Sequence, residues 1–284
     1  MAEADGHRLP IEPKAGSVQS LAEVVGDIDR RVRQGDTQEF TSISTGFDEL
    51  DLAISGGFRQ GQLVLLSGPA GVGKTSFTMQ LARNIAESGQ AVCLFACYEH
   101  EVDYLAQRLI SMESVGTVEA GPGDGLRLRD IADLVQALPD GKQSHPGFIS
   151  AVAQDPRGAR ALERISRYSR NLLFIAGSSY TTTVRSLAEA VARVRAPGGV
   201  AHNKQVVLFV DYLQKIAAST PHAQEEARNV EAIEGLKELA LGQGIVVVSI
   251  VASQVEGLKA QRKRLRKKLN LQPDEDLEVV LSQI

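Results

Sequence analysis

The sequence contains no long hydrophobic run, no leader-like start and no excess of positive charge. No apolar stretch approaches the ~20 residues of a membrane-spanning helix, and the opening residues MAEADGHR lack the basic and apolar regions of a signal peptide. The formal net charge is −4, so the chain as a whole is not a polyanion binder, and any nucleic-acid surface must be local. These absences lead us to expect a cytoplasmic protein without a membrane partner.

Cysteine is scarce as well. The sequence has 2 cysteines, Cys93 and Cys97, and their spacing in an apolar run puts them on the same side of a predicted strand. Disulfides are rare in reducing compartments, where a small thiol commonly serves as a buried apolar group. We therefore expect two buried free cysteines rather than a disulfide or a metal pair.

One stretch, LVLLSGPAGVGKTS at 63–76, carries a specific chemical signal. An apolar run precedes a glycine-rich loop, and a helical pattern follows it, which is the context that G-x-x-x-x-G-K-[ST] requires. Glycines let the backbone turn its N–H groups toward an anion, and the new helix adds its positive end. The pattern predicts a binding site for the phosphates of ATP, made by Gly68, Pro69, Ala70, Gly71, Val72, Gly73, Lys74, Thr75 and Ser76.

Two acidic residues complete the predicted site. Asp211 ends the apolar stretch QVVLFVD, and downstream of a phosphate loop such an acid binds Mg²⁺ together with a hydroxyl, here that of Thr75. Glu99 follows the apolar stretch AVCLFAC, at the strand end where open α/β sheets place catalytic groups. We expect Lys74 to contact the β- and γ-phosphates and Glu99 to activate the attacking water. The structural alternatives are an Asp211 that caps a turn and a Glu99 that only favours a helix N-terminus.

The order of the patterns predicts one large α/β domain, since 284 residues can bury a sizeable core. Apolar runs alternate with helical patterns, which is typical of a doubly wound, mostly parallel sheet with flanking helices. The predicted strands are 63–66, 90–99, 171–177, 205–214 and 244–254. The predicted helices include 74–87, 126–138, 159–169, one capped within 181–183, and 223–241, the last with Val230, Ile233, Leu236 and Ala240 directed inward.

A helix over 17–34, with Ser17 as its predicted N-cap, precedes these elements. Its apolar positions recur in alternating steps of three and four, which gives the narrow seam of a heptad pattern. The seam residues are Val18, Leu21, Val25, Ile28 and Val32. The helix is expected to dock either on a neighbouring subunit or on its own domain, and the pattern does not choose between the two.

Four stretches together resemble the C-terminal ATPase domain of bacterial replicative helicases of the DnaB type, which has a RecA-like fold. They are STGFDELD (44–51), GPAGVGKTS (68–76), LFACYEHEVDYLAQRL (94–109) and VVLFVDYLQ (206–214). The resemblance runs from about 42 to 254 and implies an ATP-dependent motor that acts with Mg²⁺ on single-stranded DNA in replication, as a hexameric ring. It also implies a catalytic role for Glu99.

The resemblance implies a RecA-like ATPase domain over 41–284, with a helical elaboration at about 111–170 and a basic segment at 259–268. A disordered tail (1–16) and a linker helix with connector (17–40) stand where the family has a helical N-terminal domain. Two alternatives to a helicase remain: a regulatory or recombination ATPase of the KaiC or RadA kind without unwinding activity, and a non-catalytic nucleotide-binding module. The acidic pair Glu99 and Asp211 argues against the second.

The chain departs from the family pattern after the last predicted strand. Ser253 and Gln254 lie about two positions later than the family's Ser-Gln. A run of basic residues stands where the family has a DNA-contacting loop and an arginine finger, for which Arg262, Arg264 and Arg266 are candidates. Its cations can neutralise phosphates without reading sequence, or pair with the acidic residues at 274–278. The predicted DNA-binding residues are Lys259, Arg262, Lys263, Arg264, Arg266, Lys267 and Lys268.

Overall fold

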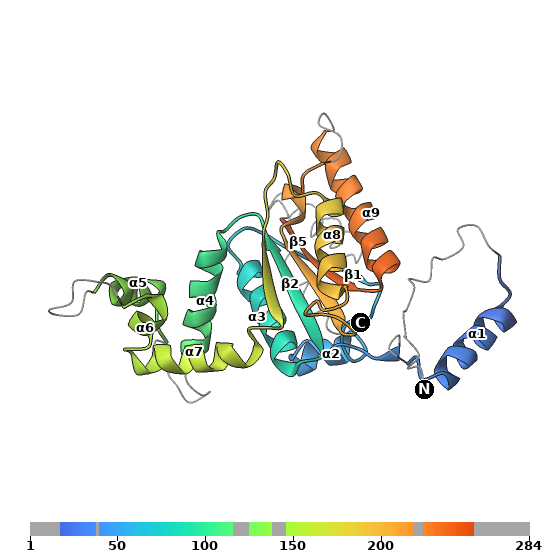
Figure 1. Cartoon of the computed structure of the whole chain (residues 1–284). Coiled ribbons are helices and arrows are strands. Elements are labelled where there is room, and N and C mark those ends of the chain that lie inside the picture. Colours follow the sequence, from blue (N-terminus) through green and yellow to red (C-terminus); the bar gives the residue numbers. More distant parts are fainter. Residues whose placement is uncertain (1–17, 38–39, 116–124, 138–145, 219–223, 253–284) are drawn as a thin grey trace, which may run out of the picture.

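The structure, a computed structural model, describes residues 18–37, 40–115, 125–137, 146–218 and 224–252 (Figure 1). Its centre is a five-stranded sheet with the strand order β1-β5-β4-β2-β3, in which every pair is parallel. The strands are β1 (Leu63–Gly68), β2 (Ala91–Cys97), β3 (Leu172–Ala176), β4 (Gln205–Asp211) and β5 (Val246–Ala252). Helices cover both faces, so the predicted doubly wound α/β fold is confirmed.

The helices divide into those that cover the sheet and those that extend from it (Figure 1). One face packs on α3 (Lys74–Ser88), α4 (Val102–Ser114) and α7 (Pro156–Tyr168), and the other on α8 (Val184–Arg195) and α9 (Glu225–Gln243). The remaining elements are α1 (Leu21–Arg33), α2 (Asp48–Ala53), α5 (Leu128–Gln136), α6 (Phe148–Val152) and the 3₁₀ turn η2 (Leu213–Lys215). Of the helices in the described ranges, none has the length and apolar character to cross a membrane.

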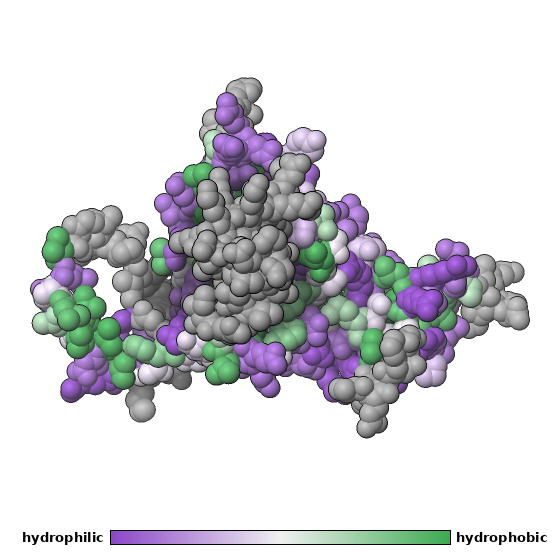
Figure 2. Space-filling model, turned by 180° about the vertical axis from the view of Figure 1, so that it is seen from behind, coloured by the Kyte–Doolittle hydropathy of each residue, from purple (hydrophilic) through white to green (hydrophobic). Residues whose placement is uncertain are grey.

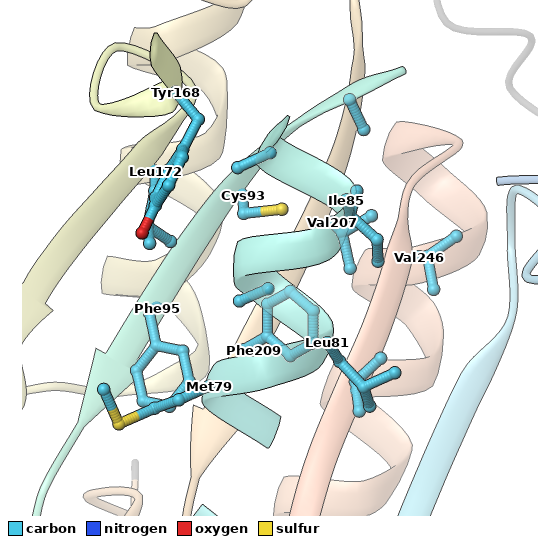
Figure 3. Packing of buried hydrophobic residues seen from close by; sticks show 14 of the residues in the cluster. Met79, Leu81, Ile85, Cys93, Phe95, Tyr168, Leu172, Val207, Phe209 and Val246 are labelled. Carbon is cyan, nitrogen blue, oxygen red and sulfur yellow. The ribbon is translucent and has the colours of Figure 1, made fainter. Parts of the chain in front are cut away.

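Alternate side chains of the central strands point to opposite faces, and this builds two cores. In the first core, Met79 of α3 lies beside Phe95 and Ile85 of α3 lies beside Val207, and the rings of Phe95 and Phe209 stack with centroids 5.9 Å apart (Figure 3). The second core joins β4 and β5 to α8 and α9. Both cysteines are free and buried in the first core, as predicted. Every residue of β2 is buried, which explains why its sequence is a continuous apolar run.

Parallel pairing brings the ends of the strands level with one another. Cys97 at the end of β2 pairs with Asp211 at the end of β4. Gly68 at the end of β1 pairs with Ala252 at the end of β5. All four residues lie at the carboxyl edge of the sheet, which is where open α/β sheets bind ligands.

A buried ion pair attaches the helical elaboration to α3. Arg83 of α3 donates from Nε to Oε1 of Glu113 on α4 at 2.6 Å, and the Tyr168 hydroxyl of α7 donates to the same oxygen at 2.8 Å. The Glu113 side chain is 4% exposed, and a buried carboxylate is tolerated only when it is paired and hydrogen-bonded in this way. Beyond this contact, α5 and α6 pack on a small core of their own, made by Ile110, Leu126, Ile131, Val152 and Ala161.

The first helix differs from its prediction. It begins at Leu21, and its N-cap is Ser20 rather than Ser17, so that prediction was wrong. The Ser20 hydroxyl accepts from the Glu23 backbone N–H while the Glu23 carboxylate accepts from the Ser20 backbone N–H, and this reciprocal capping box fixes the start. Val18 precedes the helix and is 98% exposed, so it is not part of the apolar seam. No residue of α1 is buried.

Other differences are confined to short elements and to one helix face. The sequence analysis did not identify two short helices, α2 in the stretch before the first strand and the five-residue α6 in the predicted elaboration. In α9, Val230 was predicted to point inward but is 52% exposed. Leu236 and Ala240 are buried as predicted, and Ala232 and Leu239 are buried with them. Val230 and Ala232 both fit the helical spacing, so the sequence period alone did not fix the edge of the buried face.

Candidate nucleotide site

The phosphate loop joins β1 to α3 at the carboxyl edge of the sheet. Gly71 and Gly73 have φ values of +80° and +92°, a conformation that side chains with a Cβ rarely adopt. Gly73 is also the residue at which α3 begins, without a side-chain cap. The first N–H groups of the helix therefore remain available to an anion, as at other helix N-termini that bind phosphate.

Lys74 closes over the loop from the first turn of α3. Its Nζ donates to the backbone oxygens of Gly68 and Pro69, both at 2.8 Å. These two carbonyls hold the ammonium over the loop that the sequence predicts to bind phosphate. A phosphate oxygen bound there would compete with them for the same three donors.

Asp211 and Thr75 lie together, as the sequence analysis expected of metal ligands. Asp211 is 1% exposed, and burial raises the pKa of its carboxyl above the ordinary value, while a hydrogen bond from the Thr75 side chain opposes the rise. The charges of Glu99, His100 and Lys74 also act on Asp211. Its Oδ2 is buried, and no described residue supplies it with a hydrogen-bond partner.

This arrangement fits a divalent cation. A buried carboxylate oxygen without a donor is costly unless something neutralises it, and an oxygen ligand beside a hydroxyl suits Mg²⁺. In the described part of the chain, no three His, Cys, Asp or Glu side chains gather as a metal centre. A Mg²⁺ ion here would therefore be held by Asp211 and Thr75 with oxygens from a nucleotide and water.

Glu99 lies in the turn that follows β2, and its side chain is exposed. Cys97, the last residue of β2, stabilises this turn, because its sulfur accepts a hydrogen bond from the His100 backbone N–H at 3.3 Å. Burial raises the pKa of the Cys97 thiol, and the backbone N–H groups of Glu99 and His100 oppose that rise because they point at the sulfur. The register Cys97↔Asp211 brings this turn beside the end of β4.

A row of side chains that the sequence analysis missed connects this turn to the phosphate loop. The rings of His100 and Tyr104 are 4.9 Å apart, and the Arg108 guanidinium lies 5.8 Å from the centre of the Tyr104 ring. Arg108 in turn donates to the hydroxyl of Ser76. These residues recur at every fourth position, with His100 in the turn and Tyr104 and Arg108 on α4, and this spacing is the signal that could have identified them.

The segment STGFDELD supports α3 from its other side. The Asp51 carboxylate accepts from the hydroxyls of Ser44 at 2.6 Å and Thr45 at 2.7 Å. Burial alone would raise the pKa of Asp51, but these hydrogen bonds outweigh it and the pKa is lowered. The Thr45 backbone oxygen accepts from Asn84, and the rings of Phe47 and Phe77 are 5.2 Å apart. The segment thus fixes the helix that carries Lys74 and Thr75.

The basic segment at 259–268, the pair Ser253 and Gln254, and the predicted tail at 1–16 lie outside the described residues. The structure therefore brings together the phosphate loop, Thr75, Asp211 and the turn with Glu99.

Comparison with known proteins agrees with this geometry. A family model described as the DnaB-like helicase C-terminal domain matches residues 42–270. Among solved structures, one described as an ATPase domain has a TM-score of 0.62 at 17% identity, over 86% of this chain and 74% of that one. A DnaB-like replicative helicase, solved in a study of its interactions with primase, has a TM-score of 0.58 at 18% identity, over 86% and 50%. At these identities the likeness to solved structures concerns the fold.

Curated relatives match over shorter stretches. Protein RecA of Prochlorococcus marinus (strain NATL1A) is 30% identical over 132 residues, which are 43% of this chain and 35% of that protein. DNA repair protein RadA of Campylobacter jejuni is 44% identical over 55 residues, which are 19% and 12%. The chain thus spans about a third of the first of these relatives and less of the second.

The buried charge of Asp211 predicts a gain in stability when it is removed. Because its pKa is raised in the folded protein, folding becomes less favourable as the pH rises from the unfolded to the folded pKa. Asp211→Asn, which can still accept from Thr75, should therefore stabilise the nucleotide-free protein at pH 7.5 by about 0.5–2 kcal/mol. Urea denaturation checks this value, and the gain should shrink as the pH falls toward 4. A loss of stability at pH 7.5 would contradict the assignment of an uncompensated charge.

Proposed function

Because the chain belongs to the DnaB-like helicase C-terminal domain family, we propose that it is a motor ATPase that binds MgATP and couples its hydrolysis to single-stranded DNA. One observation carries the nucleotide part of this proposal: the buried Oδ2 of Asp211, which has no hydrogen-bond partner among the described residues, lies beside Thr75 and the phosphate loop. A buried carboxylate at this place lowers stability unless a cation that is bound with the nucleotide neutralises it. We further propose 41–284 as the ATPase domain.

The residues at the carboxyl edge have complementary tasks in this proposal. The N–H groups at the start of α3 and the Lys74 ammonium bind the phosphates. Asp211 and Thr75 hold Mg²⁺, which when bound neutralises phosphate charge. Arg108 adds a cation beside Ser76, close to the positive end of α3, and a bound anion stabilises both.

Glu99 is the proposed base for the attacking water. Its side chain is exposed at the edge, in a turn that Cys97 fixes, and its charge acts on Asp211. Phosphoryl transfer needs mainly positioning and charge compensation. The Glu99 carboxylate, in a turn at the end of β2 near Asp211, would position the attacking water.

The DNA part of the proposal depends on the basic segment at 259–268 and on the family. The segment carries seven basic residues in ten on a chain of net charge −4, so it creates a local positive field. No aromatic residue is interleaved, so contacts to the phosphate backbone are expected rather than base stacking. The similarity to RecA and RadA supports the alternative, a recombination or regulatory ATPase without unwinding activity.

Assembly of several copies, as a hexameric ring, is the third part of the proposal. The apolar side chains of α1 are exposed, with Leu21 at 78% and Val25 at 55%, and they form a green patch at the left edge of Figure 2. Because no residue of α1 is buried against its own chain, we propose a second copy of the protein as the partner of this surface.

Two variants test the nucleotide site. Lys74→Ala should reduce hydrolysis about 10²–10³-fold and weaken ATP binding, because the phosphate charge loses its partner. Glu99→Gln should bind MgATP like the parent but hydrolyse it poorly, because only the base is lost. Phosphate release and the binding of a fluorescent ATP analogue measure the two properties, with exposed Glu101→Gln as the control for the second change. Parental turnover in Lys74→Ala would refute the phosphate-binding role.

The DNA-binding segment is tested by replacing five of its cations with Gln. Affinity for single-stranded DNA should fall, and its dependence on log[salt] should flatten by about 0.7 for each phosphate that the protein no longer neutralises. The ATPase rate should no longer rise with DNA. The replaced residues are Arg262, Lys263, Arg264, Arg266 and Lys267.

A control variant replaces Arg129, Arg167 and Arg185, which are exposed on α5, α7 and α8, with Gln. It should retain DNA binding. If the five-residue variant keeps the parental affinity and salt slope, the segment is not the DNA site, and an ATPase without DNA coupling becomes the better proposal.

Self-assembly is tested on α1. Replacing Leu21 and Ile28 with Asp should lower the molar mass in sedimentation, because two charges then interrupt the apolar seam. Ala22→Asp, which adds a charge off the seam, should leave the mass unchanged. An unchanged mass in the double variant together with a lower melting temperature would mean that α1 packs on its own domain.

A further inference from the structure

The end of β5 loses its neighbour before it reaches the carboxyl edge. Pairing between β4 and β5 runs from Val207↔Val246 to Val210↔Ser249 and stops there. On its other side, β5 continues to pair with β1 as far as Gly68↔Ala252. The last residues of β5 therefore extend past the ladder that joins them to the strand of Asp211.

The side chain of Gln214 takes the place of the missing strand. Its Nε2 donates to the Ala252 backbone oxygen at 2.9 Å, and its Oε1 accepts from the Ala252 backbone N–H at 3.2 Å. A carboxamide carries one donor and one acceptor in the same relation as a peptide group. Gln214 thus satisfies with one side chain both backbone groups of Ala252, which in a continued parallel ladder would bond to two different residues of β4.

Because of its position in the chain, Gln214 links the end of β4 to the end of β5. Gln214 lies in η2, three residues after Asp211, and Ala252 is the register partner of Gly68 in the phosphate loop. Leu213, between them, is 1% exposed and packs in the second core, so η2 is anchored. The Gln214 side chain therefore connects β4, which ends in the proposed metal ligand Asp211, to the end of β5, which lies beside the phosphate loop.

We propose that Gln214 is a positioning residue for ATP hydrolysis, which fixes the distance between the Asp211 strand and the phosphate loop through the Gln214–Ala252 pair. This inference rests on the proposed function, since it concerns the same reaction. Reacting groups must lie within about 3–3.5 Å of each other, and an error of about 1 Å can cost roughly 10²-fold in rate. The pair acts on the alignment of bound MgATP rather than on the contacts that bind it.

Two substitutions separate the parts of the pair. Gln214→Ala removes both bonds. Gln214→Glu keeps the length and the acceptor but removes the donor to the Ala252 oxygen and sets a carboxylate against it. Gln136→Glu, the same chemical change at an exposed position of α5, is the matched control.

The expected result is a fall in kcat with little change in KM for MgATP. Both Gln214 variants should lose about 10-fold or more in kcat, with KM within about 2-fold of the parent, and Gln136→Glu should match the parent. In hydrogen exchange, the Ala252 amide should exchange faster in Gln214→Ala, while amides of β4 keep their protection. A purely structural role would lower the melting temperature and leave kcat unchanged.

The controls distinguish failure of this inference from failure of the proposed function. If Lys74→Ala loses hydrolysis and both Gln214 variants keep the parental kcat, the positioning role is refuted and the ATPase stands. If Lys74→Ala hydrolyses like the parent, the proposed function itself fails. Unchanged exchange at Ala252 in Gln214→Ala would refute the pair whatever the kinetics. If Gln214→Ala does not fold, Gln214→Glu provides the same kinetic comparison.

Discussion

Parallel backbone pairing is the constraint on which the rest of this structure depends. It sets Cys97 level with Asp211 and Gly68 level with Ala252, and so collects the candidate groups at one edge without any direct bond among most of them. A one-residue slip of a strand is disfavoured, because it would move each side chain of that strand from one packed core into the other, where its shape does not fit. The relative positions of the candidate site residues are therefore fixed by the packing of the two cores, away from the carboxyl edge.

The buried charge of Asp211 at this edge of the sheet lowers the stability of the folded protein. Asp211 is buried with an oxygen to which no residue in the described ranges donates, while the Lys74 ammonium is held by carbonyl oxygens rather than by that acid. The buried carboxylate of Glu113, by contrast, is fully paired, because it accepts from both Arg83 and Tyr168. The contrast between the two carboxylates is a physical reason to assign chemistry to the first and support to the second.

The sequence predicted what depends on long apolar runs and on glycine spacing. All five strands, the helix after the phosphate loop and the meeting of Thr75 with Asp211 could be predicted, because buried strands and a phosphate loop have strong patterns. The N-cap of α1 could not be predicted, since Ser17 and Ser20 are equally good capping residues. The edge of the buried face of α9 could not be predicted either, since Val230 and Ala232 both fit the helical spacing. Contacts between side chains and backbone, such as those of Gln214 and Cys97, depend on tertiary distances that no spacing in the sequence encodes.

The separate core of α5 and α6 has a consequence for how this fold can vary. These two helices bury their apolar residues in a small core that they share with α4 and α7, whereas α4 and α7 hold the ion pair to α3. A change of length or sequence in α5 and α6 therefore leaves the sheet covered and the phosphate-loop helix anchored. We therefore expect this part of the chain to tolerate changes of length and sequence that α4 and α7, which contact α3, would not.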